Sequence, residues 1–440
     1  MSGDKNASWA KTKAVFIVSS GNFLEMYDFM VFGYYAKAIG RAFFPAVNPA
    51  ASLLLAFMTF GAGFLMRPVG AVVLGSYIDR HGRRKGLLLT LALMGVGTLA
   101  IAGMPTYAQI GLAAPLLVLL GRLIQGLSAG VEVGGASVYL SEVATQGRRG
   151  FYVAWQSASQ QVAVIFAALV GLLLNSLMPP GAMETWGWRL PFVVGSLLLP
   201  FLLLVRRALK ETEAFEHSTS RPDLRASLNT ILGNSGIVLL GMGMAVTTTV
   251  FFYMLTAYTP TYGSSVLDLS PAQSMLVTLI VGMTNFVLLP VMGALSDRIG
   301  RTPQLVACSL LAALLGYPAL QWMVAAPSFE RLVMVDLLLA AIYAGYNGAL
   351  VVHLTEIMPA NVRTTGFALA YSLATAIFGG FTPALSTYLI AATGDKGAPG
   401  IWLTGAGLIS LLAVIAVAQM ARRGRRGEVL GPDLSTDRAI

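Results

Sequence analysis

Two arginines interrupt the apolar stretches of this sequence, and their chemistry suits a bound anion. Arg67 and Arg122 both lie well inside such stretches. A guanidinium presents forked N–H donors that match the two oxygens of a carboxylate, so both side chains are candidate ligands for an anion. Each could instead be held in an ion pair with Glu25, Asp28 or Glu132, and the sequence leaves both possibilities open.

Acids occur in the same apolar stretches. Asn22, Glu25 and Asp28 recur at a spacing of three, which places them on one face of a helix. A carboxyl that faces a cavity can take up and release a proton as its surroundings change. We predict proton sites at Asp28 and Glu132, with Glu25 as a third candidate that is favoured more as a salt bridge. The same carboxylates could also hold a sodium ion.

A second polar stripe belongs to the helix that carries Arg122. Spacings of three, four and three place four residues on one face of it: Arg122, Gln125, Ala129 and Glu132. Gly126, Gly130 and Gly134 recur at a spacing of four on another face, where small residues let a neighbouring helix approach closely. This helix therefore has a polar side and a packing side.

Neutral hydrogen-bonding side chains extend the candidate ligand set. Gln156 and Gln160 lie four residues apart on one helix face. The complete set of predicted ligands is Arg122, Arg67, Asn22, Tyr27, Gln125, Gln156, Gln160, Tyr253, Tyr346, Asn347 and Tyr371. Because the second half of the chain has few charges in its apolar stretches, we expect it to contribute mainly hydroxyls and amides.

The composition defines the elements that position these residues. Hydrophobic residues make up 56% of the 440 and charged residues only 11%, with a mean hydropathy of +0.72, whereas about a quarter of a soluble domain is charged. A helix needs about 20 apolar residues to cross a bilayer. The sequence predicts an all-α membrane protein with twelve spans, at 14–39, 52–78, 86–104, 110–140, 150–177, 188–206, 232–260, 272–295, 303–325, 331–357, 364–391 and 399–421.

The basic residues predict the orientation. With both termini in the cytoplasm, 22 of the 29 Lys and Arg residues fall in cytoplasmic segments and five on the outer side, as the positive-inside rule requires. The net charge of +9 thus reflects topology and does not indicate a nucleic-acid partner. Cys308 is the single cysteine, so we expect neither a disulfide nor a metal site built on thiols.

Two loops repeat one motif half a chain apart. Residues 75–85 read Gly-Ser-Tyr-Ile-Asp-Arg-His-Gly-Arg-Arg-Lys, and residues 293–301 read Gly-Ala-Leu-Ser-Asp-Arg-Ile-Gly-Arg. Asp79 and Asp297 are 218 residues apart. The motif lets two helices end close together, and its charges can pair across the face where the protein closes.

A second motif pair supports the same duplication. Glu142 precedes Arg148, Glu356 precedes Arg363, and the two glutamates are 214 residues apart. Two motif pairs in the same order predict two pseudo-symmetric six-helix bundles, with an N-terminal bundle, a cytoplasmic linker and a C-terminal bundle at 1–206, 207–231 and 232–440. We predict cytoplasmic gating by Asp79, Arg80, Arg83, Glu142, Arg148, Asp297, Arg298, Arg301, Glu356 and Arg363.

These motifs carry a family resemblance over essentially the whole chain. The two Asp-Arg-x-Gly-Arg loops resemble the signature loop of the major facilitator superfamily. The segments similar to its metabolite:proton symporter family are 21–29, 64–70 and 121–126. Within that family, the segments that resemble the citrate and tricarballylate symporters are 134–140, 155–157 and 371–376.

The resemblance implies import of a tricarboxylate with a co-transported proton, by alternating access of two halves around a midplane site. It implies no cofactor, a place in the bacterial cytoplasmic membrane, a small carboxylate and the lipid bilayer as partners, and action as a monomer. Relatives with similar motifs carry dicarboxylates, shikimate, betaine or proline. Sodium coupling and a metal–citrate cargo also stay open.

Other classes of membrane protein fit less well. An enzyme needs an oriented nucleophile, a metal cluster or a phosphate-binding loop, and the loops contain none of these patterns. A receptor needs a signalling domain, for which the tails 1–13 and 422–440 are short. A channel needs an open pore, whereas two unlike halves with sparse charge favour an occluded site.

Overall fold

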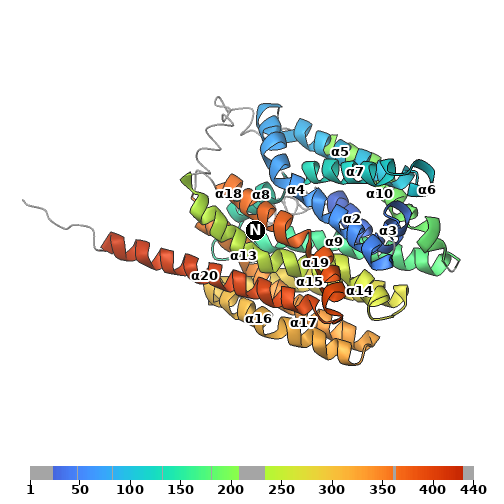
Figure 1. Cartoon of the computed structure of the whole chain (residues 1–440). Helices are drawn as coiled ribbons and strands as arrows, with labels where there is room; N and C mark the ends of the chain where they lie inside the picture. The colour runs from blue at the N-terminus through green and yellow to red at the C-terminus, as the bar shows by residue number, and fades with distance from the viewer. Residues whose placement is uncertain are drawn as a thin grey trace, which may run out of the picture.

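The structure is a computed structural model that describes residues 23–46, 48–81, 83–130, 132–179, 181–207, 233–359 and 363–429. All regular secondary structure in these segments is helical (Figure 1). The first half of the chain contains α2 (Phe23–Tyr34), α3 (Ala36–Phe43), α4 (Pro49–His81), α5 (Arg83–Gly103), α6 (Tyr107–Ile110), α7 (Ala113–Ala129), α8 (Glu132–Val143), α9 (Arg149–Leu177), the π-helical turn η1 (Met183–Gly187) and α10 (Arg189–Arg207).

The second half repeats this plan with two spans that each contain a π-helical turn. Its elements are α13 (Ser235–Tyr253), η2 (Met254–Tyr258), α14 (Thr259–Ser265), α15 (Pro271–Ile299), α16 (Arg301–Ala325), α17 (Phe329–Ile357), α18 (Arg363–Ala374), η3 (Thr375–Gly379), α19 (Thr382–Thr393) and α20 (Pro399–Val429). The continuous helical stretches Ser235–Ser265 and Arg363–Thr393 each form one span.

Each half packs mainly on itself, and the two halves meet along a few helices. In the first half α7 packs on α4 and α5, and α5 on α10; in the second, α20 packs on α13 and α16, and α17 on α15 and α16. Most blue-to-green helices accordingly lie together above the yellow-to-red ones in Figure 1. The broadest contact between the halves joins α9 to α15.

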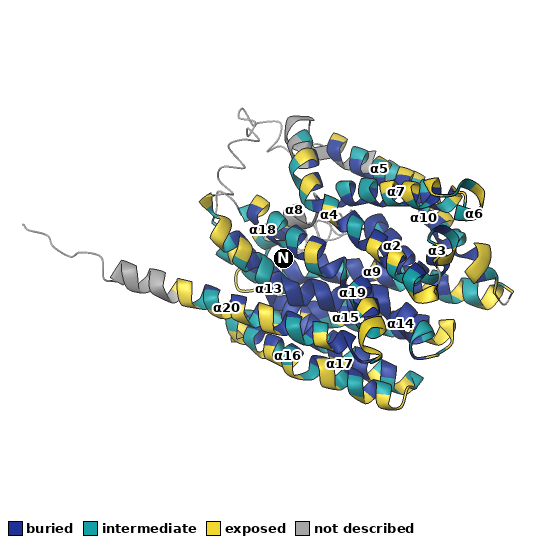
Figure 2. Ribbon diagram, viewed as in Figure 1, coloured by how far each residue is buried: buried dark blue, intermediate teal, exposed yellow. Residues whose placement is uncertain are grey.

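The spans have the dimensions that a bilayer requires. Eight helical stretches are long and apolar enough to cross a membrane, and three shorter apolar helices are Leu88–Gly103, Ala113–Ala129 and Arg189–Phe201. Together with α2 they account for the twelve predicted spans. Figure 2 shows buried residues concentrated in the middle and exposed ones on the outer faces. Large apolar side chains such as Leu112, Leu197 and Leu412 are exposed there, as expected of a surface that faces lipid.

The fourth predicted span, 110–140, contains a turn close to its start. Gly111 takes a positive φ of 59° between α6 and α7, a conformation that glycine adopts without steric cost. The described helix then runs to Ala129, and α8 begins at Glu132, while residue 131 lies outside the described part. Beyond the turn at Gly111, α7 and α8 thus lie within the predicted span.

Glycines allow α4 and α7 to approach closely. A Cβ added at Gly126 would overlap the carbonyl oxygen of Gly63, and one at Gly130 would overlap that of Arg67. The predicted packing side of this helix is thus confirmed at Gly126 and Gly130. Because the backbones touch, the two arginine-bearing helices hold their side chains in one fixed relation.

Candidate functional site

A four-residue polar network lies in the middle of the first half. The Arg122 Nη1 atom of α7 donates to Asp28 Oδ2 of α2 at 2.9 Å and to Gln125 Oε1 at 2.8 Å. Thr98 Oγ1 of α5 donates to Asp28 Oδ1 at 2.8 Å and accepts from Gln125 Nε2 at 3.2 Å. All four side chains are buried, with Arg122, Asp28 and Gln125 at 0% exposure. Three helices therefore meet at one buried charge pair.

Aromatic rings surround the Arg122 guanidinium. Its Cζ atom lies 4.5 Å from the ring centroids of Phe29 and Phe32 and 5.4 Å from that of Phe60. The ring faces attract the cation and exclude water, which strengthens every electrostatic interaction in the site. The Nε and Nη2 atoms of Arg122 have no hydrogen-bond partner among the described residues. This guanidinium therefore has donors left for a further acceptor.

Arg67 and Glu25 form a second buried pair beside the first. Arg67 Nη2 lies 2.5 Å from Glu25 Oε1, and both side chains are at most 7% exposed. The Arg67 Cζ atom lies 4.6 Å from the Phe64 centroid and 5.1 Å from that of Phe29, so Phe29 contacts both guanidinium groups. Arg67 Nε is also without a described partner. Both arginines are therefore ion-paired in this arrangement, Arg67 with Glu25 and Arg122 with Asp28.

The second half reaches this site with two of the predicted tyrosines. The Tyr253 ring packs edge-on against Phe64, with centroids 5.0 Å apart, and also against Phe60 at 6.0 Å. Tyr253 and Tyr371 both interact electrostatically with Arg67. The predicted ligands of the two halves therefore converge around the arginines.

Other predicted ligands use their polar groups in packing. The Tyr27 hydroxyl donates to the Pro191 carbonyl at 2.8 Å and ties α2 to α10. The Tyr346 hydroxyl donates to the Met244 carbonyl at 2.7 Å and ties α17 to α13. Both rings are fully buried. In this arrangement these two hydroxyls support helix packing.

The predicted amides are buried near the interface of the halves. Gln156 and Gln160 of α9 are 4% and 6% exposed, and Gln156 Oε1 accepts from Ser157 Oγ at 3.1 Å. Asn347 Nδ2 of α17 donates to the Tyr343 hydroxyl at 3.4 Å, while its Oδ1 has no described partner. Asn22 and the Glu132 side chain lie outside the part of the chain that the structure describes.

Two buried polar residues, Thr98 and Asp336, are not among the predicted site residues. Thr98 supplies a hydroxyl to Asp28, and a lone threonine in an apolar span gives no signal that could have found it. Asp336 of α17 is 5% exposed and accepts from Thr259 Oγ1 at 2.8 Å. It lies inside the predicted span 331–357, where an acid is itself a signal. The expectation of a mainly hydroxyl and amide surface in the second half is therefore incomplete.

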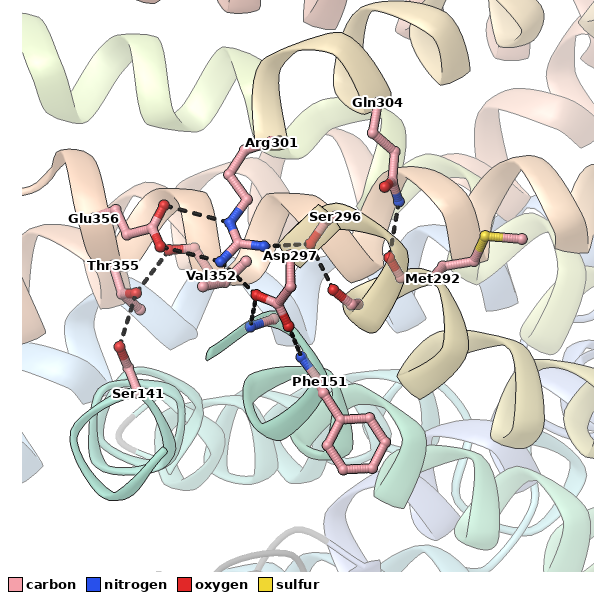
Figure 3. A network of polar contacts seen from close by, with 12 residues as sticks. Ser141, Phe151, Met292, Ser296, Asp297, Arg301, Gln304, Val352, Thr355 and Glu356 are labelled. Carbon is pink, nitrogen blue, oxygen red and sulfur yellow. Dashed lines mark hydrogen bonds and ion pairs between the residues drawn. The ribbon is translucent and has the colours of Figure 1, made fainter. Parts of the chain in front are cut away.

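A charged network joins the two halves at the end of the molecule that carries Asp297 (Figure 3). The Asp297 carboxylate accepts the backbone N–H groups of Gly150 at 2.8 Å and Phe151 at 3.0 Å. These groups begin α9, whose N-terminal dipole favours an anion. Arg301 Nη2 lies 2.8 Å from Asp297 and 3.3 Å from Glu356. One carboxylate from the second half thus caps a helix of the first.

The local sequence explains why this motif has its shape. Gly300 ends α15 with a φ of 91°, which glycine adopts without steric cost. The turn lets Arg301 begin α16 directly beside Asp297. Nearby, Thr355 Oγ1 donates to Ser141 Oγ at 3.4 Å, a further contact between the halves (Figure 3).

The remaining predicted gating residues that the structure describes lie outside this network. Glu142, Arg148 and Arg298 are exposed at this end, and Arg363 is partly buried. The side chains of Asp79, Arg80 and Arg83 lie outside the described part. Hence the structure describes the network around the second copy of the motif only.

Comparisons with known proteins define the class of this protein. The family model for sugar (and other) transporters matches residues 14–227 and 205–422. A solved structure of a xylose transporter from E. coli, in a partially occluded inward-open conformation, superposes with a TM-score of 0.74 over 98% of this chain and 99% of its own, at 17% identity. That similarity shows the fold alone, which is the twelve-helix arrangement of the major facilitator superfamily.

Curated relatives match along most of their length. A citrate-proton symporter of Salmonella typhi is 56% identical over 400 residues, covering 91% of this chain and 92% of its own. One of Klebsiella pneumoniae is 54% identical over 407 residues, covering 92% of each chain. The chain therefore belongs to the sugar (and other) transporter family of the major facilitator superfamily, and it is an integral membrane protein.

Proposed function

We propose that this protein imports citrate or tricarballylate in symport with a proton. The observation that carries the proposal is its similarity, along nine-tenths of its length, to two citrate-proton symporters. The site chemistry supports it, because two buried guanidinium groups lie beside one another and share an aromatic cover. Such a pair suits a substrate with several carboxylates.

The unpartnered donors of Arg122 and Arg67 would receive the substrate. Nε and Nη2 of Arg122 can form the two parallel hydrogen bonds that a carboxylate accepts. Nε of Arg67 would bind a second carboxylate. Tyr253 and Tyr371 would add neutral donors from the second half, so that the substrate contacts both halves at once.

Proton coupling follows from competition for Arg122. The ionised Asp28 carboxylate is stabilised by hydrogen bonds from Arg122 Nη1 and Thr98 Oγ1. A carboxylate bound at Nε and Nη2 of Arg122 shares the same positive charge and adds a negative charge beside Asp28, which favours protonation of Asp28. Substrate and proton would then occupy the site together. Glu25 beside Arg67 can act in the same way, and Glu132 stays a predicted proton site.

The membrane potential makes such coupling necessary. Citrate carries about three negative charges at neutral pH, given ordinary carboxyl pKa values. Inward movement against an inside-negative potential costs about 2.3 kcal/mol per charge per 100 mV. Uptake therefore needs compensating cations, and protons can serve without a dedicated metal site.

Transport would proceed by alternating access across the bacterial inner membrane. We assign the Asp297 end and both chain termini to the cytoplasm, because the basic residues gather in those segments. A bundle at 1–206 and one at 232–440, joined by a linker at 207–231 and acting as a monomer, would rock around the arginines. The Asp297 contact with Gly150 and Phe151 would close the cytoplasmic side.

Uptake of labelled citrate into proteoliposomes tests this proposal. The protein is reconstituted, a pH gradient is imposed with and without sodium, and tricarballylate and betaine are added as competitors. We expect saturable uptake that the pH gradient alone drives and that tricarballylate inhibits.

Two results would contradict the proposal in different ways. A strict requirement for sodium would leave citrate as the substrate but refute the proton as the coupling ion. Absence of citrate uptake, with inhibition of any residual flux only by betaine, would refute the substrate assignment and leave the family alone standing.

A further inference from the structure

Asp336 is a buried acid that forms no ion pair with any residue that the structure describes. The basic residues of the second half at this end have other partners: Arg331 Nη1 donates to the Trp322 carbonyl at 2.7 Å, and Lys396 Nζ lies 3.4 Å from Asp268. The described partner of Asp336 is the Thr259 hydroxyl. An ionised carboxylate in a membrane span with one neutral donor is costly, so such residues usually serve transport.

The geometry around Thr259 accommodates two protonation states. Its Oγ1 atom lies 2.8 Å from Asp336 Oδ2 and 3.3 Å from the Met254 carbonyl oxygen. A threonine hydroxyl has one proton to donate and two lone pairs to accept with. It can therefore donate to only one of these two oxygens at a time.

We propose that Asp336 is a second proton-binding residue of the transport cycle and that Thr259 relays its protonation state to η2. When Asp336 is ionised, Thr259 donates to the carboxylate. When Asp336 takes up one proton, its new O–H donates to Thr259 Oγ1, and the threonine proton turns to the Met254 carbonyl. The one covalent bond that forms is the O–H bond of Asp336, whose proton comes from the aqueous phase. The Thr259 O–H bond stays intact and only rotates. The proposal rests on proton-coupled transport as the function.

The relay reaches a contact between the two halves. Thr259 joins η2 to α14, and both elements touch α2 of the first half. Thr261 Oγ1 of α14 donates to the Gly33 carbonyl at 3.3 Å. A Cβ at Gly33 would lie 3.0 Å from the carbonyl oxygen of Ala257 in η2. A proton at Asp336 would thus change hydrogen bonding in the segment that closes this end against α2.

The other ionisable neighbours leave Asp336 as the group that changes charge. Tyr262 of α14 interacts electrostatically with Asp336, and its hydroxyl donates to the Lys396 carbonyl at 2.7 Å. Asp395 interacts with the same tyrosine, and its Oδ2 accepts from Gln321 Nε2 at 2.5 Å. A tyrosine hydroxyl keeps its proton at physiological pH, so Tyr262 does not change its charge together with Asp336.

Proteoliposome assays with Asp336→Asn separate binding from proton coupling. Asparagine imitates the protonated carboxyl and cannot release a proton. We expect citrate exchange between equal pools to continue, while accumulation driven by a pH gradient falls about tenfold per pH unit, since each coupled proton contributes one factor of the gradient. Asp268→Asn is the control, because the Asp268 side chain is 84% exposed.

Unchanged accumulation in Asp336→Asn beside an active wild type would overturn this inference alone. A wild type without pH-driven citrate uptake would instead refute the proposed function, and this inference with it.

If Asp336→Asn neither exchanges citrate nor folds, the variant Thr259→Val tests the relay. Loss of the donor disfavours the ionised carboxylate, so we expect the pH profile of uptake to move to higher pH and Thr259→Ser to restore it. Coincident profiles for Thr259→Val and wild type would contradict the relay.

Discussion

The two halves solve the problem of buried polarity in different ways. The first half buries charges as pairs, Arg122 with Asp28 and Arg67 with Glu25. The second half ties its helices mainly with neutral hydroxyls, such as Thr247 to the Ala406 carbonyl at 2.9 Å, and its buried acid Asp336 also has a hydroxyl partner, Thr259. Neutral bonds of this kind contribute about 0.5–1.5 kcal/mol each and change little when an anion arrives.

This difference shows where a charged substrate can act. A buried ion pair stays favourable only while both partners are present, since removing one costs about 3–5 kcal/mol. A carboxylate that enters beside Arg122 therefore alters the balance of the first half far more than that of the second. The second half would respond through Tyr253 and Tyr371, which interact with Arg67.

Removal of the Arg122 charge should have the largest effect. Arg122→Gln leaves Asp28 buried without its cation and removes the donors proposed for the substrate. We expect citrate uptake to fall by more than about thirtyfold, because truncation of one partner of a buried charge pair costs about 2–5 kcal/mol. Initial rates in proteoliposomes measure it.

A double variant separates folding from binding at this position. Arg122→Gln with Asp28→Asn leaves no unpaired charge, so thermal stability in detergent should recover toward wild type while uptake stays lost. Recovery of uptake in the double variant would contradict the role of Arg122 as a substrate ligand.

Close packing of the arginine-bearing helices should come next. Gly126→Ala introduces a Cβ that overlaps the Gly63 carbonyl oxygen, and overpacking of this kind costs about 1–3 kcal/mol. We expect a lower melting temperature in detergent and a matching loss of uptake. Gly405→Ala in α20 is the matched control, since nothing lies within 4 Å of its added Cβ; it should be neutral or stabilising by about 0.5–1 kcal/mol. Equal melting temperatures for the two variants would contradict the close approach.

Loss of the carboxylate that joins the halves should have a moderate effect. Asp297→Asn keeps one acceptor oxygen, so one of the N–H groups of Gly150 and Phe151 loses its partner. We expect the Asp297 end to open more often, because a hydrogen bond to a charged group contributes about 1.5–3 kcal/mol.

Spin labels at Gln146→Cys and Ile299→Cys, in a Cys308→Ser background, report this opening as a distance distribution. Both labelled positions are exposed. Glu356→Gln provides the comparison, because its contact with Arg301 is longer, at 3.3 Å, and more exposed. Identical distributions for Asp297→Asn and wild type would remove Asp297 from the closure.

An exposed ion pair of the first half should have the smallest effect. Glu184 lies 2.6 Å from Arg41 and 3.4 Å from Lys37, with half of its side chain exposed. Partial burial raises the pKa of Glu184, but the Arg41 hydrogen bond and the two positive charges outweigh it and lower the pKa below its ordinary 4.5. This contribution is present above pH 4.5 and disappears as the pH falls through the lowered value.

Glu184→Gln should therefore cost less than about 1 kcal/mol at neutral pH, as exposed pairs do. The difference in melting temperature between wild type and variant should shrink in acid. A difference that grew on acidification would contradict a lowered pKa of Glu184 in the folded protein.

The sequence predicts the helices well because lipid imposes a length and an apolar character on every span. It does not predict the π-helical turns η2 and η3, since these interrupt apolar runs without a change in composition. The turn at the start of the fourth span had a local cue in Gly111, whose positive φ follows α6. Chain position alone cannot reveal such a break, because glycines also occur inside continuous helices here.

The site is only partly readable from sequence. Helical spacing places Asp28 and Arg122 on polar faces but does not choose their partners, which depend on how α2, α5 and α7 pack. The hydrogen bond from Thr98 to Asp28 cannot be predicted for the same reason. Asp336 had a signal, an acid inside a predicted span, whereas the pairing of Asp297 with the start of α9 required the approach of two segments 146 residues apart.

Proton uptake on citrate binding shows whether Asp28 couples the substrate to a proton. Titration calorimetry of the purified protein, in buffers with different heats of ionisation, counts the protons that bind with citrate. We expect the wild type to take up one more proton per citrate than Asp28→Asn, because the bound carboxylate shares the Arg122 charge and favours protonation of Asp28. Equal proton counts, with citrate still bound by both proteins, would contradict it.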